Sequence, residues 1–200
     1  MKVKVIGGGG REHAIIKKLK TSKEITELYA LPGNGGIAED AVCVNIGATD
    51  IAGQVKFATE NKIDYAVVAP DDPLCLGSVD ELTKAGIPCF GPDKKAAIIE
   101  GSKVFSKNLM KKYGIPSAAY EVFDNAKSAL LYLETAPLPA VIKADGLALG
   151  KGVIIAETRE EAKRAVREIM EDKVFGKSGE KIYAKTFLML FVNFLANGLV

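Results

Sequence analysis

The sequence predicts an open, doubly wound α/β domain over residues 1–102, followed by a smaller α+β unit over residues 103–182. In the first segment, short runs rich in β-branched residues alternate with segments of helical periodicity. These runs are almost continuously apolar, which is typical of parallel strands buried on both faces. Beyond Gly91 the pattern changes to two strands joined by a loop and flanked by helices. Residues 183–200 fit neither unit and form an anomalous, mostly apolar tail.

The elements of the first domain follow from apolar runs and from residues that begin or end helices. Strands are expected at residues 3–6, 27–31, 41–46 and 65–70. Helices are expected at residues 11–20, from Thr49 or Asp50 to about Asn61, and at 78–86. The last of these helices ends at Gly86, and the segment 87–92 follows it. This strand–helix alternation predicts a parallel sheet that is covered on both faces.

The second unit is expected to open with a helix near Ser102, which Gly114 and Pro116 end. The next elements are a strand at 118–123, a helix at 126–134, and strands at 140–144 and 152–157. Thr158 and Glu161 have the spacing of a capping box at the start of a further helix. The two later strands and their connecting loop therefore predict a β–loop–β hairpin flanked by helices.

Composition excludes several classes of protein. The net charge of +2 arises from nearly equal numbers of acids and bases, so nothing indicates a nucleic-acid or membrane-surface partner. The three cysteines are far apart, odd in number and without CxxC spacing, which predicts neither a disulfide framework nor a zinc site. The first residues lack the apolar core of a signal peptide. We therefore expect a cytoplasmic protein; the composition predicts no oligomeric state.

A glycine-rich turn, "VIGGGGREHA", joins the first strand to the first helix. Glycines allow the backbone to approach an anion, whose charge a helix N-terminus favours. A dinucleotide fingerprint would need a third glycine where Glu12 stands, together with an acid at the end of the second strand. Both are missing, so a nicotinamide-dependent oxidoreductase is disfavoured. Phosphate or a phosphorylated small substrate is the favoured ligand of Gly9 and Gly10, and a tight turn without a ligand is the alternative.

The first turn of that helix also carries Arg11, Glu12 and His13. Arg11 can form a bidentate contact with phosphate, and Glu12 can bind an amine or a hydroxyl. His13 is the only histidine of the chain. We expect it to have a structural role and not to act as a catalytic base.

Polar residues also follow the second and fourth predicted strands, in "LPGNGG" and "APDDPLCLG". Doubly wound sheets bind ligands at the carboxyl ends of their parallel strands. Asn34, Asp71 and Asp72 are therefore candidate substrate contacts, although the same residue types are also common in ordinary turns.

The loop "KADGLALGKGV" places Lys143 and Lys151 at the two ends of a glycine-rich connection between strands. Lysine suits phosphate oxygens, while Gly146, Gly150 and Gly152 supply backbone N–H groups and mobility. A Walker A loop is excluded, because no Ser or Thr follows Lys151 and no helix begins there. The loop indicates a movable flap over a polyphosphate; an exposed hairpin with solvated lysines is the alternative.

Five segments together resemble the phosphoribosylamine–glycine ligase family, whose members are ATP-grasp enzymes of purine biosynthesis. They are "GGGGREHA", "PGNGG", "PDDPLCLGSVDEL", "FGPDKKAAIIEGSKVFSKNLMKKYGIPSAAY" and "VIKADGLALGKGVIIA". The resemblance runs from Met1 to about Ile182 in the family's order and spacing. It implies a Rossmann-like (pre-ATP-grasp) domain that helps to bind phosphoribosylamine, followed by part of an ATP-grasp lid. Ala69, directly before the third segment, departs from the glycine that is usual in the family's motif there.

The resemblance also implies a reaction and a set of site residues. ATP would phosphorylate the carboxylate of glycine, and the amine of phosphoribosylamine would attack the glycyl phosphate to give glycinamide ribonucleotide, ADP and phosphate. By matching motif, Lys103 and Lys143 would contact the phosphates of ATP, and Lys151 with the glycines around it would form the flap. The residues implied on the phosphoribosylamine side are Gly9, Gly10, Arg11, Glu12 and Asp71.

The resemblance ends in "YAKTFLMLFVNFLANGLV", which contains no acidic residue. This tail cannot supply the oxygen ligands that magnesium requires, so the Mg²⁺ ligands are expected in a C-terminal part that is missing here. An altered reading frame would explain the abrupt change, and resequencing the encoding DNA tests that hypothesis. We therefore expect a truncated chain with little or no ligase activity. The alternatives are a non-catalytic module that binds a nucleotide or phosphoribosyl group, and another ATP-grasp ligase of purine synthesis.

Overall fold

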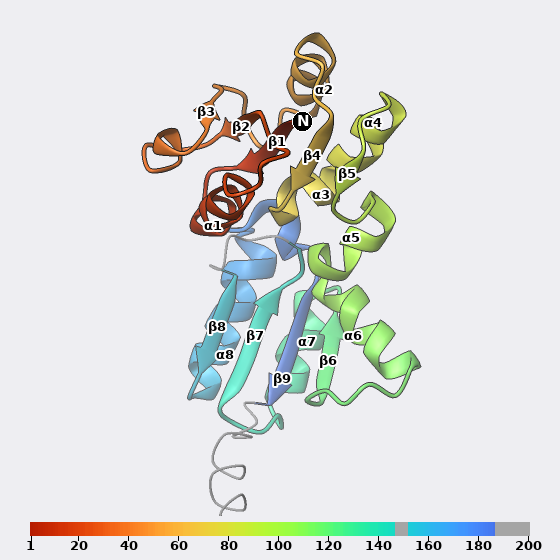
Figure 1. Ribbon diagram of the computed structural model, residues 1–200. Helices are drawn as coiled ribbons and strands as arrows, with labels where there is room; N and C mark the ends of the chain where they lie inside the picture. Colours follow the sequence, from red (N-terminus) through yellow and green to blue (C-terminus); the bar gives the residue numbers. More distant parts are fainter. Residues whose placement is uncertain (147–151, 187–200) are drawn as a thin grey trace, which may run out of the picture. The chain divides into compact units, whose positions relative to one another are not determined.

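The computed structural model describes residues 1–146 and 152–186 (Figure 1). They fall into two compact units, of which the first spans Met1–Gly101 and the second begins at Ser102. Gly150, Lys151 and residues 187–200 of the predicted tail lie outside the described residues.

The first unit contains a five-stranded parallel sheet, as the apolar runs predicted (Figure 1). Its spatial order is β3-β2-β1-β4-β5. The strands are β1 (Lys2–Gly7), β2 (Glu27–Pro32), β3 (Val42–Cys43), β4 (Tyr65–Val68) and β5 (Cys89–Phe90). Because the strand order reverses between β1 and β4, the carboxyl ends of these two strands form the crevice in which such sheets bind ligands.

Helices cover both faces of this sheet. They are α1 (Gly10–Leu19), α2 (Ile51–Glu60), α3 (Asp71–Leu76), α4 (Ser78–Lys84) and α5 (Lys94–Gly101), with a 3-10 turn η1 (Ile37–Glu39). On one face, Ile16 of α1 packs with Val3 and Val5. On the other face, Ala58 of α2 and Leu82 of α4 pack against further strand residues. The sheet is therefore buried between two apolar layers, which explains its continuous apolar strands.

Three elements differ from the prediction. Helices α3 and α5 were not predicted, because the sequence around Asp71 and Asp72 also has the composition of a turn. Both acids lie in the first turn of α3, where the helix dipole favours negative charge. The strand predicted at 41–46 is only two residues long, since Val42 lies on an edge strand and is 60% exposed. A single neighbouring strand supports less regular pairing there.

One buried group of the first unit is unexpected, because β1 carries a lysine inside its apolar layer. Lys4 is fully buried, and its Nζ donates a hydrogen bond of 2.7 Å to the backbone oxygen of Gln54. The Gln54 side chain, also buried, accepts from Ser78 Oγ at 2.7 Å and donates to the Ala48 oxygen at 2.6 Å. Burial lowers the pKa of Lys4 to about 8.

The second unit contains a four-stranded antiparallel sheet in the order β6-β9-β7-β8. The strands are β6 (Tyr120–Phe123), β7 (Ala140–Ala144), β8 (Val153–Ala156) and β9 (Ile182–Thr186). The helices are α6 (Lys103–Lys112), α7 (Ala126–Leu133) and α8 (Arg159–Val166), followed by a π-helical turn η2 (Arg167–Glu171) and a 3-10 turn η3 (Gly176–Gly179). Strands β7 and β8 form the predicted hairpin.

Residues 183–186, which the sequence analysis assigned to the tail, belong to β9 and pair with both β6 and β7. The period-two pattern of β9 is visible in its packing, because Ile182 and Ala184 lie in the core with α7 and α8 while Tyr183 does not belong to that cluster. The continuous apolar run that follows conceals this alternation in the sequence. The second unit thus extends past residue 182.

The two faces of this sheet have different partners. Ile142 and Ala144 of β7 belong to the same core cluster as residues of α7 and α8. Because side chains alternate along a strand, Lys143 and its cross-strand partner Tyr183 lie on the opposite face. The sheet therefore presents a lysine and an aromatic ring on the face that α7 and α8 do not cover.

The predicted capping box at α8 is confirmed. Thr158 Oγ1 accepts from the Glu161 N–H at 3.2 Å, and the Glu161 carboxylate accepts from the Glu157 N–H at 2.9 Å and the Thr158 N–H at 3.3 Å. We expect Thr158→Ala to lower the free energy of unfolding by about 1 kcal/mol, as measured by urea denaturation. Thr135→Ala, at an exposed site, is the control; an equal loss in both variants would contradict a capping role.

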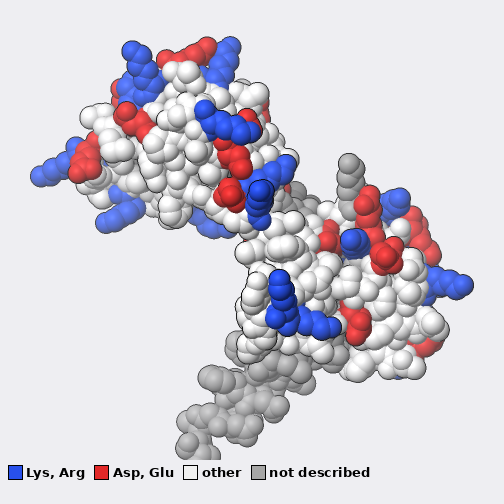
Figure 2. Space-filling model, turned by 90° about the vertical axis from the view of Figure 1, so that its right-hand side faces the viewer, with Lys and Arg blue, Asp and Glu red and all other residues white. Residues whose placement is uncertain are grey.

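Every helix in the described part of the chain is too short or too polar to cross a bilayer. On the face shown in Figure 2, Lys and Arg side chains are interspersed with Asp and Glu. This face therefore mixes charges of both signs, as the nearly equal numbers of acids and bases in the sequence suggest.

Candidate functional site

The β1–α1 turn packs closely against two neighbouring loops. Gly7 has a φ of +119°, and a Cβ at this position would lie 2.6 Å from Glu12 Cγ and 2.8 Å from Pro70 Cγ. A Cβ on Gly8 would lie 2.5 Å from the Gly33 oxygen. Glycine is therefore required at both positions, because the loops after β1, β2 and β4 meet here at the carboxyl edge of the sheet.

Glu12 is the most deeply buried polar group of this turn, with a side chain that is 5% exposed. Its Oε2 accepts a hydrogen bond of 2.6 Å from the Gly9 N–H. Its Oε1 is buried and has no hydrogen-bond partner among the described residues; the Nε of Arg11 lies 4.0 Å away. A buried carboxylate oxygen without a donor is costly, so the site favours a ligand that brings an N–H or O–H group.

The hydrogen bond between Gly9 and Glu12 also makes the glycine turn a poorer binding site for phosphate. The Gly9 N–H is already used by Glu12, and a carboxylate next to the helix N-terminus opposes a second negative charge. The guanidinium of Arg11 is therefore a more suitable partner for a phosphate, and its side chain is 75% exposed.

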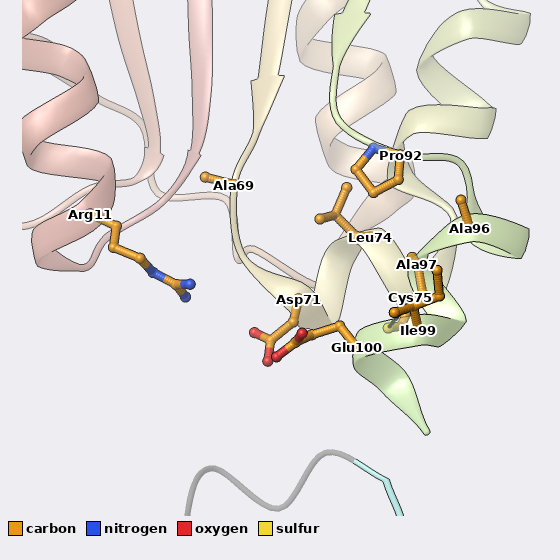
Figure 3. A pocket seen from close by; sticks show the side chains of 10 residues that line it. All are labelled: Arg11, Ala69, Asp71, Leu74, Cys75, Pro92, Ala96, Ala97, Ile99 and Glu100. Carbon is orange, nitrogen blue, oxygen red and sulfur yellow. Dashed lines mark hydrogen bonds between the residues drawn. The ribbon is translucent and has the colours of Figure 1, made fainter. Parts of the chain in front are cut away.

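A cavity of about 510 Å³ lies beside this turn within the first unit. It is lined by Arg11, Ala69, Asp71, Leu74, Cys75, Pro92, Ala96, Ala97, Ile99 and Glu100. Figure 3 shows the Arg11 side chain reaching toward the carboxylates of Asp71 and Glu100. The cavity thus combines one guanidinium with two carboxylates, next to the buried carboxylate of Glu12. This balance suits a ligand that has one anionic end and several hydroxyl or amine donors.

Cys75 is the thiol in this cavity. Burial, together with the charges of Asp71, Asp72 and Glu100, raises its pKa above the usual value for a cysteine. Its Sγ donates to the Ala97 oxygen at 3.5 Å. The thiol is therefore kept protonated and is not an activated nucleophile.

Asn34, a predicted substrate contact, is used within the protein. Its Nδ2 donates to the Gly8 oxygen at 2.7 Å, and its Oδ1 accepts from the Ile37 N–H at 2.9 Å. The Gly33 N–H also donates to the Gly7 oxygen at 3.2 Å. Asn34 therefore holds the loop after β2 against the glycine turn, and it does not line the cavity that contains Arg11 and Asp71.

His13 belongs to an ionic cluster. Its Nε2 lies 3.0 Å from Asp40 Oδ2, and the ammonium groups of Lys17 and Lys20 lie 3.1 Å and 2.9 Å from the same carboxylate. Lys20, followed by His13 and Lys17, holds the pKa of Asp40 far below its usual value. These contacts give His13 a structural role in joining α1 to the loop after η1.

In the second unit, Lys143 is the penultimate residue of β7 and lies across the sheet from Tyr183. Its Nζ is 5.7 Å from the centre of the Tyr183 ring, close enough for a cation–π contact. Burial, and to a smaller extent the charge of Asp145, raises the pKa of Tyr183 to about 12. Tyr183 therefore stays neutral, and Lys143 is oriented over its ring.

Lys103 and Gly146, which are far apart in the sequence, are brought into direct contact. Lys103 Nζ donates a hydrogen bond of 2.5 Å to the Gly146 oxygen. Gly146 has a φ of +96°, and a Cβ there would lie 2.9 Å from Ser178 Oγ. At the other end of the loop, the Gly152 oxygen accepts from the Ala144 N–H at 2.9 Å. Two predicted ATP-binding positions, Gly150 and Lys151, lie outside the described residues.

Sequence reasoning missed two acids at these sites. Glu100 lines the cavity of the first unit, but no pattern in the sequence distinguishes it from a surface residue. Asp145 accepts hydrogen bonds from the start of α6; its position between Lys143 and Gly146 was a visible signal. Among the described residues, no three His, Cys, Asp or Glu side chains are grouped to hold a metal ion.

Two family models account for most of the chain. Residues 1–100 match the N domain of phosphoribosylglycinamide synthetase, and residues 101–190 match its ATP-grasp (A) domain. The chain belongs to the phosphoribosylglycinamide synthetase family. The second match continues past residue 183, in agreement with the extent of β9.

Curated relatives of this synthetase family show the same correspondence. The chain is 47% identical over 189 residues to a phosphoribosylamine–glycine ligase of Streptococcus suis, a match that covers 94% of this chain and 45% of the relative. It is 48% identical over 188 residues to the ligase of the same name from Caldanaerobacter subterraneus, with the same two coverages. The chain thus spans a little under half the length of the curated relatives that it matches.

Solved structures support the fold. The crystal structure of phosphoribosylamine–glycine ligase from Thermotoga maritima matches with a TM-score of 0.74 and 30% identity, over 94% of this chain and 44% of that one. The biotin carboxylase domain of Hydrogenobacter thermophilus 2-oxoglutarate carboxylase, solved with MgADP, matches with a TM-score of 0.73 and 17% identity, over 94% and 44%. At that identity the second match shows a shared fold alone.

Proposed function

We propose that this chain provides the phosphoribosylamine-binding unit and the beginning of the ATP site of a phosphoribosylamine–glycine ligase. Both family models and the named relatives support this proposal. In the proposed reaction, ATP phosphorylates the glycine carboxylate. The amine of phosphoribosylamine then attacks the glycyl phosphate, the new C–N bond forms, and phosphate leaves.

The observation that carries the proposal is the buried Oε1 of Glu12, which has no hydrogen-bond partner among the described residues and lies at the switch point between β1 and β4. Phosphoribosylamine has hydroxyl and amine donors that match this oxygen, and a phosphate that matches the guanidinium of Arg11. Asp71, across the cavity, is proposed to accept from a second donor of the ribose. Gly9 and Gly10 have no side chain, so the substrate can approach the backbone of the turn. Asn34 holds the turn in place through its hydrogen bond to the Gly8 oxygen.

In the second unit, Lys103 and Lys143 are proposed to bind the phosphates of ATP. A transferring phosphoryl group requires positioned positive charge, and both lysines already have fixed partners near the described ends of the glycine loop. Gly146 and Gly152 border that loop. Gly150 and Lys151 are proposed to close over the nucleotide, on the basis of the sequence alone.

Magnesium accompanies ATP in most phosphoryl-transfer enzymes and neutralises its developing charge. The described residues contain no converging set of acidic ligands, so they do not fit a magnesium site. We assign no step of the reaction to a metal held by these residues.

Binding of ribose 5-phosphate tests the proposal, because this sugar carries a hydroxyl where phosphoribosylamine carries its amine. We expect calorimetry to detect binding to the unaltered chain, and we expect Glu12→Gln and Arg11→Met each to weaken it by about tenfold or more, the loss of one charge-assisted hydrogen bond. Lys18→Met, which removes an exposed charge from the same helix, should leave the affinity unchanged. No binding, or equal effects in all three variants, would contradict the proposed site.

An assay of ADP release in the presence of glycine and phosphoribosylamine separates the two functional alternatives. Binding of the sugar phosphate without ADP formation is the behaviour of a phosphoribosyl-binding module, and this is what we expect of the 200 residues alone. Turnover at the rate of an ordinary ligase would show that they suffice for the reaction.

A further inference from the structure

We infer that Asp145 is a positioning residue that sets the ammonium group of Lys103 for the phosphates of ATP. This inference rests on the proposed role of Lys103 and adds a residue to it. Asp145 is separated from Lys103 by 42 positions in the sequence, and nothing in the local pattern around either residue requires them to meet.

The carboxylate of Asp145 binds the start of helix α6. It accepts from Ser102 Oγ at 3.0 Å and 3.2 Å through its two oxygens, and from the Val104 N–H at 3.1 Å. Ser102 is also the N-cap of α6, because its Oγ accepts from the Phe105 N–H at 3.0 Å. One carboxylate therefore binds both neighbours of Lys103, Ser102 through its hydroxyl and Val104 through its backbone N–H.

The lysine side chain is held by the residue that follows this carboxylate. Lys103 Nζ donates to the Gly146 oxygen at 2.5 Å. Asp145 is itself anchored to the start of β9, since its N–H donates to the Lys181 oxygen at 2.9 Å. Residues 102–104 and 145–146 thus form one hydrogen-bonded clasp, and the clasp determines where the ammonium group lies.

This arrangement reduces the cost of binding a polyphosphate. A free lysine side chain loses rotamer entropy when it is immobilised on a ligand. In the clasp, one of the three N–H groups of Lys103 is already committed to Gly146, so much of that entropy is lost before ATP arrives. Both carboxylate oxygens of Asp145 are directed at groups of the protein, which favours positioning over direct contact with a ligand.

The test measures Mg·ATP binding by the 200-residue chain in a double-mutant cycle of Asp145→Ala and Lys103→Met. We expect each single variant to weaken ATP binding by about tenfold. Lys103→Met loses a charge-assisted contact with phosphate, and Asp145→Ala leaves a lysine side chain that must be ordered when ATP binds. Because Asp145 acts through Lys103, Asp145→Ala should have no further effect on ATP affinity in the Lys103→Met background. Its effect on urea denaturation should be equal in both backgrounds.

Two further variants separate positioning from charge. Asp145→Asn retains an oxygen that can accept from the Val104 N–H, so it should keep ATP affinity within about threefold of the unaltered chain. Asp172→Ala removes an exposed acid from the same unit and should change nothing. If Asp145→Asn weakens ATP binding as much as Asp145→Ala does, the retained acceptor oxygen does not position Lys103, and the inference is overturned.

The remaining outcomes are also decisive. Asp145 does not position Lys103 if Lys103→Met weakens ATP binding but Asp145→Ala does not. The same conclusion holds if the two losses of binding free energy are additive in the double variant. In both cases the proposed ATP site stands. If the unaltered chain binds no ATP, or if Lys103→Met leaves its affinity unchanged, both the proposed role of Lys103 and the role of Asp145 fail.

Discussion

Gly7→Ala is expected to destabilise the first unit by about 2–6 kcal/mol and to abolish binding of ribose 5-phosphate. An alanine at a φ of +119° is strained, at a cost of about 1–3 kcal/mol. Its Cβ would also lie within 2.8 Å of both Glu12 Cγ and Pro70 Cγ, and such overpacking costs about 1–3 kcal/mol more. Relief of the clash requires Glu12 to move, which would remove its bond to Gly9 and displace its unpaired oxygen.

Gly10→Ala is the matched control, because Gly10 belongs to the same turn. A Cβ at Gly10 has no atom within 4 Å, and the residue already begins helix α1. This substitution should leave stability unchanged or raise it by up to about 1 kcal/mol, since alanine restricts the unfolded chain. Urea denaturation measures the stability of both variants, and calorimetry with ribose 5-phosphate measures binding by Gly7→Ala. A Gly7→Ala variant as stable as Gly10→Ala would refute the close approach between the turn and Pro70.

Lys4→Met is expected to stabilise the protein by about 3 kcal/mol at pH 7. Burial lowers the pKa of Lys4 from 10.5 to about 8, and a difference of this size corresponds to about 3 kcal/mol between the charged and neutral forms. At pH 7 the folded protein therefore carries most of the cost of a buried ammonium. Methionine has a similar volume and no charge, so it removes that cost.

The sign of the pH dependence follows from the lowered pKa. Below pH 8 the ammonium is present in both the folded and the unfolded state, and the cost is complete. Between pH 8 and 10.5 the folded state releases the proton while the unfolded state retains it, so stability rises with pH. The advantage of Lys4→Met should therefore shrink across this range and disappear above it.

The difference in stability between the unaltered chain and Lys4→Met isolates the effect of Lys4 from that of other groups that titrate in the same pH range. Cys89 of β5 faces Lys4, and burial raises the pKa of its thiol, which opposes the lysine effect. Lys2→Met provides a second control, because Lys2 lies on the same strand but is only partly buried and is paired with Glu27 at 2.9 Å. Urea denaturation from pH 7 to 10 measures all three proteins. A Lys4→Met variant that is less stable than the unaltered chain at pH 7 would show that the hydrogen bond to Gln54 outweighs the desolvation of the charge.

An element could be predicted from the sequence wherever the residues that cause it lie close together along the chain. Continuous apolar runs predicted the parallel strands, because burial on both faces leaves no polar alternation. The capping residues Ser102 and Thr158 were predicted correctly, since a cap bonds to an N–H only a few residues away. For the same reason the two helices without a clear local signal, α3 and α5, were missed.

The sites required the fold, because their contacts join distant segments. Arg11 and Asp71 were both candidates, but only the switch point between β1 and β4 places them around one cavity. Asn34 also follows a predicted strand, as Asp71 does, yet its side chain forms hydrogen bonds with Gly8 and Ile37. The buried charge of Lys4 also has no local signature, since a lysine in a strand is normally exposed.

The sequence by itself thus determined most of the strands and helices, the glycine turn and the pair of lysines in the second unit. Tertiary structure alone decided which polar atoms form hydrogen bonds. Glu12 Oε1 has no hydrogen-bond partner among the described residues, whereas the Gly9 N–H and the Asn34 side chain do. It also decided that Asp145 meets the start of α6. The physical reason is that hydrogen bonds and burial depend on distances in space, and loop closure brings together groups whose separation along the chain carries no such information.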